Sequence, residues 1–111
     1  MMEIGLNKNE INNICSVLIN FNQLDEVVVF GSRAKGNFKP GSDVDLALKG
    51  RGLNLNVLNR ISNELDDLDL PYLFDLCIYD RIENPAFKEH INSTGISFYR
   101  NNRIVEQNNL Q

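Results

Sequence analysis

Two short stretches decide how this chain is interpreted: GSRAKG at residues 31–36 and SDVDLA at residues 42–47. The first places a glycine and a serine directly after the apolar run 27–30. The second contains two aspartates, Asp43 and Asp45, with one residue between them. A Gly-Ser turn and an Asp-x-Asp triplet are each common alone, so the information lies in their combination at this spacing.

The Gly-Ser turn is suited to phosphate. Gly31 allows the backbone to approach a phosphate closely, and Ser32 offers a hydroxyl group and a backbone N–H. If residues 33–36 begin a helical turn, the free N–H groups of that turn point at the anion. Arg33 is expected either to contact phosphate or to be a solvated loop charge, and Lys35 is expected to be a solvated charge.

The two aspartates suit a divalent metal. On a strand, Asp43 and Asp45 point to the same side, about 6.6 Å apart along the strand axis. Two ionised carboxylates so close repel each other, and a cation between them relieves the repulsion. Mg²⁺ prefers oxygen ligands and keeps part of its water shell. The alternative is a surface pair without a role.

A third aspartate extends this group. Asp75 lies in the expected strand 72–79 between the apolar residues Phe74 and Leu76, a poor setting for simple exposure. A neighbouring strand would bring Asp75 beside the other two aspartates, and three converging carboxylates require a metal. Cys77 and Tyr79 share its face of the strand; Cys77 is expected to pack, and Tyr79 to lie in the core or at the rim of the cleft.

The remaining pattern alternates helices and strands. Asn7, Asn54 and Asn84 are expected N-caps, the first within a capping box, and Gly95 is the expected C′ glycine of the last helix. The spacing of the hydrophobic residues predicts the helices and strands. We expect helices over 8–21, from 54 to about 68 and from 85 to about 94. We expect a central strand over 27–30, two further strands over 43–49 and 72–79, and an edge strand over 96–99.

Length and composition limit the function. The 111 residues fit one domain, expected over 1–100, followed by a polar tail over 101–111. A net charge of −4 argues against direct nucleic-acid binding, which needs clustered basic residues. The two cysteines lie far apart, so we expect no disulfide. The sequence has no apolar run of about 18 residues and no signal peptide, so we expect a cytoplasmic protein without a membrane span.

The spacing of Gly31-Ser32 and Asp43-x-Asp45 resembles the signature of the DNA polymerase β-like nucleotidyltransferase superfamily. The likeness covers about 27–99 and is strongest to the minimal nucleotidyltransferases. The residues that resemble these minimal members include Arg33-Ala34 and the segment from Leu70 to Leu76. It implies an α/β (α+β) fold with a short mixed sheet and helices mainly on one face. By this resemblance, the residues that would bind nucleotide are Gly31, Ser32, Arg33 and Ser42. The residues that would be catalytic and bind two Mg²⁺ ions are Asp43, Asp45 and Asp75. Asp75 would act as metal ligand, general base or both.

The same resemblance implies an activity and a partner. Minimal members pair with a helical HEPN-type protein, a toxin ribonuclease, and transfer AMP from ATP to one of its tyrosines, which makes the nucleotidyltransferase an antitoxin. Because we expect no acceptor domain in this chain, the hydroxyl must come from outside it. The alternatives are a subunit that modifies a small molecule, a non-catalytic module that binds its partner, and a glycosyltransferase. A homo- or hetero-oligomer is compatible with each.

Overall fold

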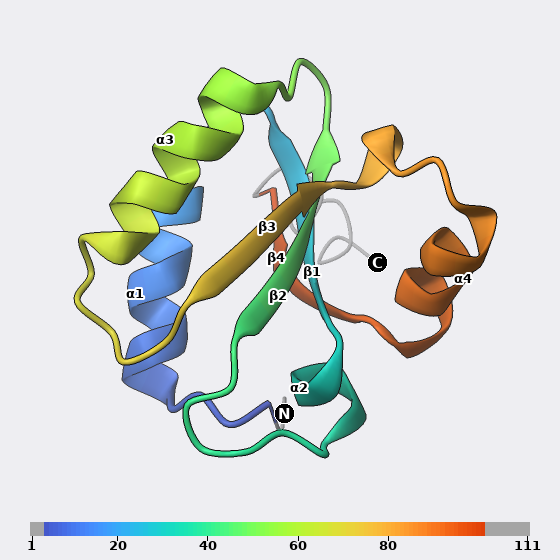
Figure 1. Ribbon diagram of the computed structural model, residues 1–111. Helices are drawn as coiled ribbons and strands as arrows, with labels where there is room; N and C mark the ends of the chain where they lie inside the picture. Colours follow the sequence, from blue (N-terminus) through green and yellow to red (C-terminus); the bar gives the residue numbers. More distant parts are fainter. Residues whose placement is uncertain (1–3, 102–111) are drawn as a thin grey trace, which may run out of the picture.

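The sheet of this protein has β1 at its centre, as the apolar run 27–30 predicts (Figure 1). The computed structural model describes residues 4–101. In chain order the elements are α1 (Lys8–Leu18), β1 (Leu24–Phe30), α2 (Ser32–Lys35), β2 (Val44–Gly50), α3 (Leu55–Asp66), β3 (Phe74–Ile78), the 3-10 helix η1 (Tyr79–Arg81), α4 (Pro85–Thr94) and β4 (Ile96–Arg100). The strand order is β3-β2-β1-β4.

The sheet is mixed because it contains two antiparallel pairs of strands and one parallel pair. β1 pairs antiparallel with β2 and with β4, whereas β2 and β3 are parallel and joined through α3. Parallel neighbours require such a long connection. The expected mixed sheet and the edge position of the last strand are therefore confirmed.

The main core lies between the sheet and the helices α1 and α3 (Figure 1). Val27 and Val29 of β1 are fully buried in it, together with residues of β2 and of both helices. Asn7 forms the predicted capping box with Glu10, and Asn54 and Asn84 cap α3 and α4 as predicted. These caps satisfy N–H groups that the first helical turn leaves unpaired.

The opposite face of the sheet carries a smaller core under α4. Ile91 of α4 packs there with Val28 and Ala47, so Val28 explains why β1 is apolar on both faces. Helices thus lie mainly on one face, as expected, with α4 covering part of the other (Figure 1). No helix within residues 4–101 is both long and apolar enough to cross a membrane.

Several expected boundaries shift. The first helix ends at Leu18, and β1 begins at Leu24 because the residues before the apolar run still pair with β2. β3 is shorter than predicted, since Tyr79 already belongs to η1. Of the predicted tail, Asn101 donates its backbone N–H to the Asp25 carbonyl (2.9 Å), and 102–111 lie outside the described residues.

Gly95 has a different role from the one predicted. It is the C-cap of α4 with φ −69°, so it does not adopt the left-handed conformation of a C′ glycine. A Cβ atom at this position would collide with the Ile91 carbonyl oxygen and with Cγ1 of Val28. Glycine is needed here because α4 approaches β1 closely.

We expect Gly95→Ala to lower the free energy of unfolding by about 1–3 kcal/mol, the usual cost of overpacking. Urea denaturation of the variant and of the natural protein measures this difference. Backbone strain is not the cause, because φ at this position is already favourable for alanine. An unchanged midpoint would show that α4 can move away from β1 without cost.

Candidate functional site

The parallel pairing of β2 and β3 places two of the predicted aspartates side by side. Asp45 and Asp75 are directly opposite each other in the register. Asp43 comes just before β2 and, like Asp75, is exposed, whereas Asp45 is half-buried. The three carboxylates therefore lie near the beginning of adjacent strands, on the face of the sheet that also carries Ala47 and Cys77.

The electrostatics of Asp45 reflect this crowding. Burial raises the pKa of Asp45, the carboxylates of Asp75 and Asp43 raise it further, and the Arg33 guanidinium opposes them. Each of the two carboxylates makes the ionised form of Asp45 less favourable, as like charges do at short range. A divalent cation would remove this repulsion.

The oxygen atoms of the three aspartates are the donors available to a metal ion at this site. Among residues 4–101, no three His, Cys, Asp or Glu side chains are arranged as a complete metal-binding cluster. Mg²⁺ is, however, commonly held by one or two carboxylates, with water and substrate phosphates completing its shell. Asp45 and Asp75, opposite each other in the register, could offer oxygen ligands in that mode, and the assignment of Asp43, Asp45 and Asp75 to Mg²⁺ stays a prediction.

The Gly-Ser turn lies against the same carboxylates. Phe30 pairs with Asp45 across β1 and β2, so Gly31 follows directly beside that aspartate. Gly31 has φ 74° and ψ −150°, a conformation available essentially to glycine alone, and a Cβ atom there would collide with Oδ2 of Asp45. Ser32 begins the short helix α2, confirming that a helical turn follows the glycine.

Arg33 corrects the sequence-based expectation. It is 1% exposed, so it is not a solvated loop charge. Its guanidinium donates through Nη1 to the Ile4 carbonyl (2.8 Å), and through Nη2 to the Ser42 carbonyl (2.8 Å). Its Nε also lies within 3.3 Å of the Asp43 carbonyl. These bonds direct Arg33 to the protein backbone, and its assignment to nucleotide binding stays a prediction.

Ser42 lies in the loop that leads to Asp43. Its hydroxyl oxygen accepts a hydrogen bond from the Lys39 backbone N–H (2.8 Å), and the Ser42 N–H donates to the Lys39 carbonyl (3.0 Å). Both bonds close a turn over 39–42. The assignment of Ser42 to nucleotide binding stays a prediction.

Cys77 lies next to the aspartates but is not a second reactive group. Burial, followed by the charges of Asp75 and Asp45, raises the pKa of Cys77 to about 11. Without a metal ion the thiol is therefore protonated at neutral pH, which disfavours a role as thiolate nucleophile. Both cysteines of the chain are free, as predicted.

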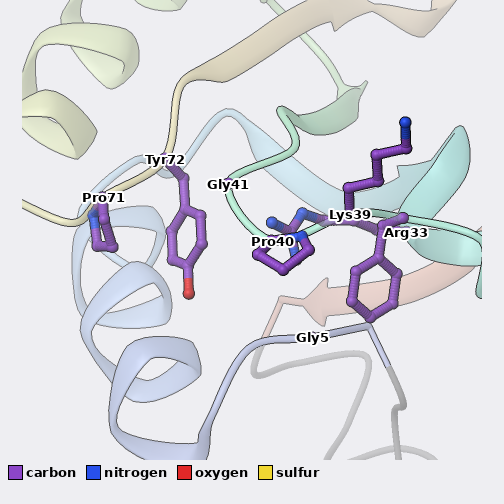
Figure 2. A pocket seen from close by; sticks show the side chains of 8 residues that line it. Gly5, Arg33, Lys39, Pro40, Gly41, Pro71 and Tyr72 are labelled. Atoms are coloured by element: carbon purple, nitrogen blue, oxygen red, sulfur yellow. The ribbon is translucent and has the colours of Figure 1, made fainter.

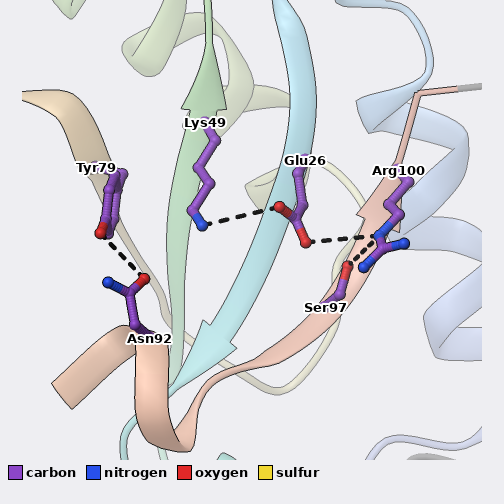
Figure 3. A network of polar contacts seen from close by, with 6 residues as sticks. All are labelled: Glu26, Lys49, Tyr79, Asn92, Ser97 and Arg100. Carbon is purple, nitrogen blue, oxygen red and sulfur yellow. Dashed lines mark hydrogen bonds and ion pairs between the residues drawn. The ribbon is translucent and has the colours of Figure 1, made fainter. Parts of the chain in front are cut away.

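Beyond Cys77, the same face ends in a polar network rather than a cleft (Figure 3). The Tyr79 hydroxyl donates to Oδ1 of Asn92 in α4 (3.0 Å), and the Nζ atoms of Lys49 and Lys88 lie 4.6 and 4.9 Å from the Tyr79 ring centroid. Lys49 also pairs with Glu26 of β1 (3.8 Å). Tyr79 thus ties η1 to α4, away from Asp45.

The sequence reasoning missed a cluster of aromatic residues around Arg33 (Figure 2). The guanidinium carbon lies 5.1 Å from the Phe38 ring centroid and 4.8 Å from that of Tyr72. These residues line a cavity of about 380 Å³, and a second cavity of about 300 Å³ lies between α3 and β3. None of the three aspartates lines either of these two cavities, and Asp43 and Asp75 are exposed.

The contact between Gly31 and Asp45 predicts a specific effect of Gly31→Ala. The positive φ should cost about 1–3 kcal/mol of unfolding free energy. The new methyl group should also displace the Asp45 carboxylate, which can rotate away, and weaken Mn²⁺ binding at least about tenfold. Titration with Mn²⁺ observed by electron paramagnetic resonance measures the affinity.

Gly36→Ala is the matched control. Gly36 also has a positive φ of 83°, but a Cβ atom there meets nothing within 4 Å. We expect a loss of about 1–2 kcal/mol of stability and unchanged Mn²⁺ affinity. Equal affinities for the two variants would contradict the role of Gly31 in placing Asp45.

Comparison with known proteins places this arrangement in a known family. The sequence family "Polymerase beta, Nucleotidyltransferase" matches residues 12–104. A comparison with curated protein sequences found no match. Among solved structures, a toxin–antitoxin crystal structure with AMP-PNP is 21% identical with a TM-score of 0.66, covering 92% of this chain and 80% of that chain.

Two further structures show the same fold. The toxin–antitoxin MntA–HepT is 18% identical with a TM-score of 0.63, covering 91% of this chain and 79% of that chain. The complex of a tri-AMPylated HEPN toxin with an MNT antitoxin from Shewanella oneidensis is 16% identical with a TM-score of 0.57, covering 90% and 77%. The sequence family spans most of the chain and the solved structures share its fold, so the chain belongs to the polymerase beta nucleotidyltransferase family.

Proposed function

We propose that this protein transfers AMP from ATP to a hydroxyl group of a HEPN-type partner, in a Mg²⁺-dependent reaction. The observation that carries the proposal is the register of β2 and β3, which sets Asp45 opposite Asp75 with Gly31 beside them. This brings carboxylate oxygens next to a turn where the backbone can approach phosphate.

The enzyme class follows from the family. Membership of the polymerase beta nucleotidyltransferase family confirms the predicted nucleotidyltransferase. It removes the glycosyltransferase alternative, which shares only the Asp-x-Asp triplet. ATP, the acceptor and the metal belong to our proposal.

In the proposed reaction, the acceptor oxygen attacks the α-phosphorus of ATP, the bond from that phosphorus to the bridging oxygen breaks, and pyrophosphate leaves. Gly31 and Ser32 would hold the phosphates, and the residues that would hold Mg²⁺ are Asp43, Asp45 and Asp75. When bound, Mg²⁺ neutralises charge on the phosphates and makes the acceptor hydroxyl more acidic. Asp75, the exposed carboxylate on the edge strand β3, receives the acceptor's proton.

A protein acceptor suits the open position of the carboxylates. Asp43 and Asp75 are exposed, so a large partner can bring its hydroxyl group to them. Structures with this fold include a toxin–antitoxin with AMP-PNP and a tri-AMPylated HEPN toxin with its MNT antitoxin. They support the same type of partner and nucleotide here.

We expect Asp43→Asn combined with Asp45→Asn to reduce AMP transfer by more than about a hundredfold, because even residues that only support metal ligands contribute about 10–100-fold. Transfer of radiolabel from α-³²P-ATP measures the rate. The matched control is Asp66→Asn, which neutralises an exposed aspartate of α3 and should leave the rate unchanged. Undiminished transfer by the double variant would refute the metal assignment.

The acceptor is identified by incubating the protein with ATP, Mg²⁺ and the HEPN-type protein encoded nearest to it, followed by mass spectrometry of both chains. We expect the partner to gain one or more AMP units, and the double variant to add none. Tight binding without any mass change would favour inhibition by contact alone. Pyrophosphate release with an unmodified partner would favour a small-molecule acceptor.

A further inference from the structure

Arg33 is more deeply buried than a residue that only binds phosphate needs to be. It is the one buried charged or polar residue among the described part of the chain, and its guanidinium reaches three separate segments. Nη1 bonds the Ile4 carbonyl before α1, while Nη2 and Nε bond the Ser42 carbonyl at 2.8 and 3.2 Å. The planar fork of arginine can donate in several fixed directions at once, which a lysine ammonium cannot.

The same guanidinium is enclosed by two aromatic rings from different loops. Phe38 comes from the loop between α2 and β2, and Tyr72 from the loop before β3. The Tyr72 hydroxyl donates to the Glu10 carboxylate at 3.0 and 3.1 Å, and Glu10 belongs to the capping box of α1. Tyr72 is therefore itself fixed against a helix.

These contacts meet at the point where β2 and β3 begin. The first bond between the two strand entries is donated by the Val44 N–H to the Leu73 carbonyl (2.9 Å). Arg33 holds the backbone of Ser42 and Asp43 on one side of this bond and packs on Tyr72 on the other. The two aspartates that face each other follow one and two residues later, at Asp45 and Asp75.

We infer that Arg33, stacked between Phe38 and Tyr72, is a positioning residue that fixes Asp43 relative to the Asp45–Asp75 pair. Its charge remains beneath the site, and its hydrogen bonds set the path of the loop over 36–43. This inference rests on the proposed function only for the metal that the three carboxylates hold; the positioning itself is a property of the backbone.

The test is Arg33→Lys, which keeps the charge and removes the fork. We expect local opening at the strand entries, so that hydrogen exchange of the Val44 amide becomes about tenfold faster than in the natural protein. Exchange of the Val29 amide, in β1 where the strand pairs with both β2 and β4, should stay within twofold. Mn²⁺ affinity, measured by electron paramagnetic resonance without nucleotide turnover, should fall about tenfold.

Arg60→Lys is the matched control. Arg60 is an exposed arginine of α3 whose guanidinium carbon lies 5.3 Å from the Phe21 ring centroid, so it also stacks on an aromatic ring but bonds no loop of the site. We expect neither amide exchange nor Mn²⁺ affinity to change. A natural protein that binds no Mn²⁺ would count against the proposed function, and the exchange at Val44 would still test Arg33.

Two results would overturn the inference. One is a result with Arg33→Lys: either exchange is accelerated equally at Val44 and Val29, or the variant does not fold. Either outcome would make Arg33 a general stabilising residue.

The other result comes from variants of Tyr72. Tyr72→Leu removes the ring from the guanidinium and should weaken Mn²⁺ binding about threefold, whereas Tyr72→Phe keeps the ring and should not; equal affinities would contradict the positioning role.

Discussion

The parallel pairing of β2 with β3 is the constraint on which the rest of the site depends. A one-residue slip in this register would turn Asp75 to the opposite face of the sheet, into the core under α1 and α3. The slip is prevented by Leu76 and Ile78, which must remain on the core side. Burial of apolar side chains on one face thus determines the position of carboxylates on the other.

The electrostatic cost of this arrangement is moderated within the fold. Placing Asp45 between Asp43 and Asp75 raises its pKa, and the buried Arg33 opposes that effect. A buried arginine is expensive to desolvate unless its donors are satisfied. Here they reach backbone carbonyls, and within residues 4–101 no buried side-chain nitrogen or oxygen lacks a partner. The cation can therefore remain under an acidic surface.

Local sequence patterns predicted most of the fold and the grouping of the aspartates. The alternation of apolar residues predicted which side chains of β2 and β3 share a face of the sheet. The three asparagine caps predicted where the helices α1, α3 and α4 begin. Other features depend on contacts between distant segments. Gly95 does follow the end of α4, yet the need for glycine there arises partly from the closeness of the Val28 side chain, 67 positions earlier in the chain (95 − 28). Likewise, β3 ends before Tyr79, whose hydroxyl bonds Asn92 of α4, 13 positions later in the chain.

Arg33 shows most clearly why local reasoning stops where it does. An arginine directly after a Gly-Ser turn has the charge and the reach expected of a phosphate ligand. Its actual partners, the carbonyls of Ile4 and Ser42 and the ring of Tyr72, come from segments that no periodicity connects. Ser32 is the first residue of the short helix α2, and the residue after it, Arg33, is buried. The same four-residue helix therefore begins at the serine that we propose holds phosphate, and it carries the arginine that we infer supports the loop leading to Asp43.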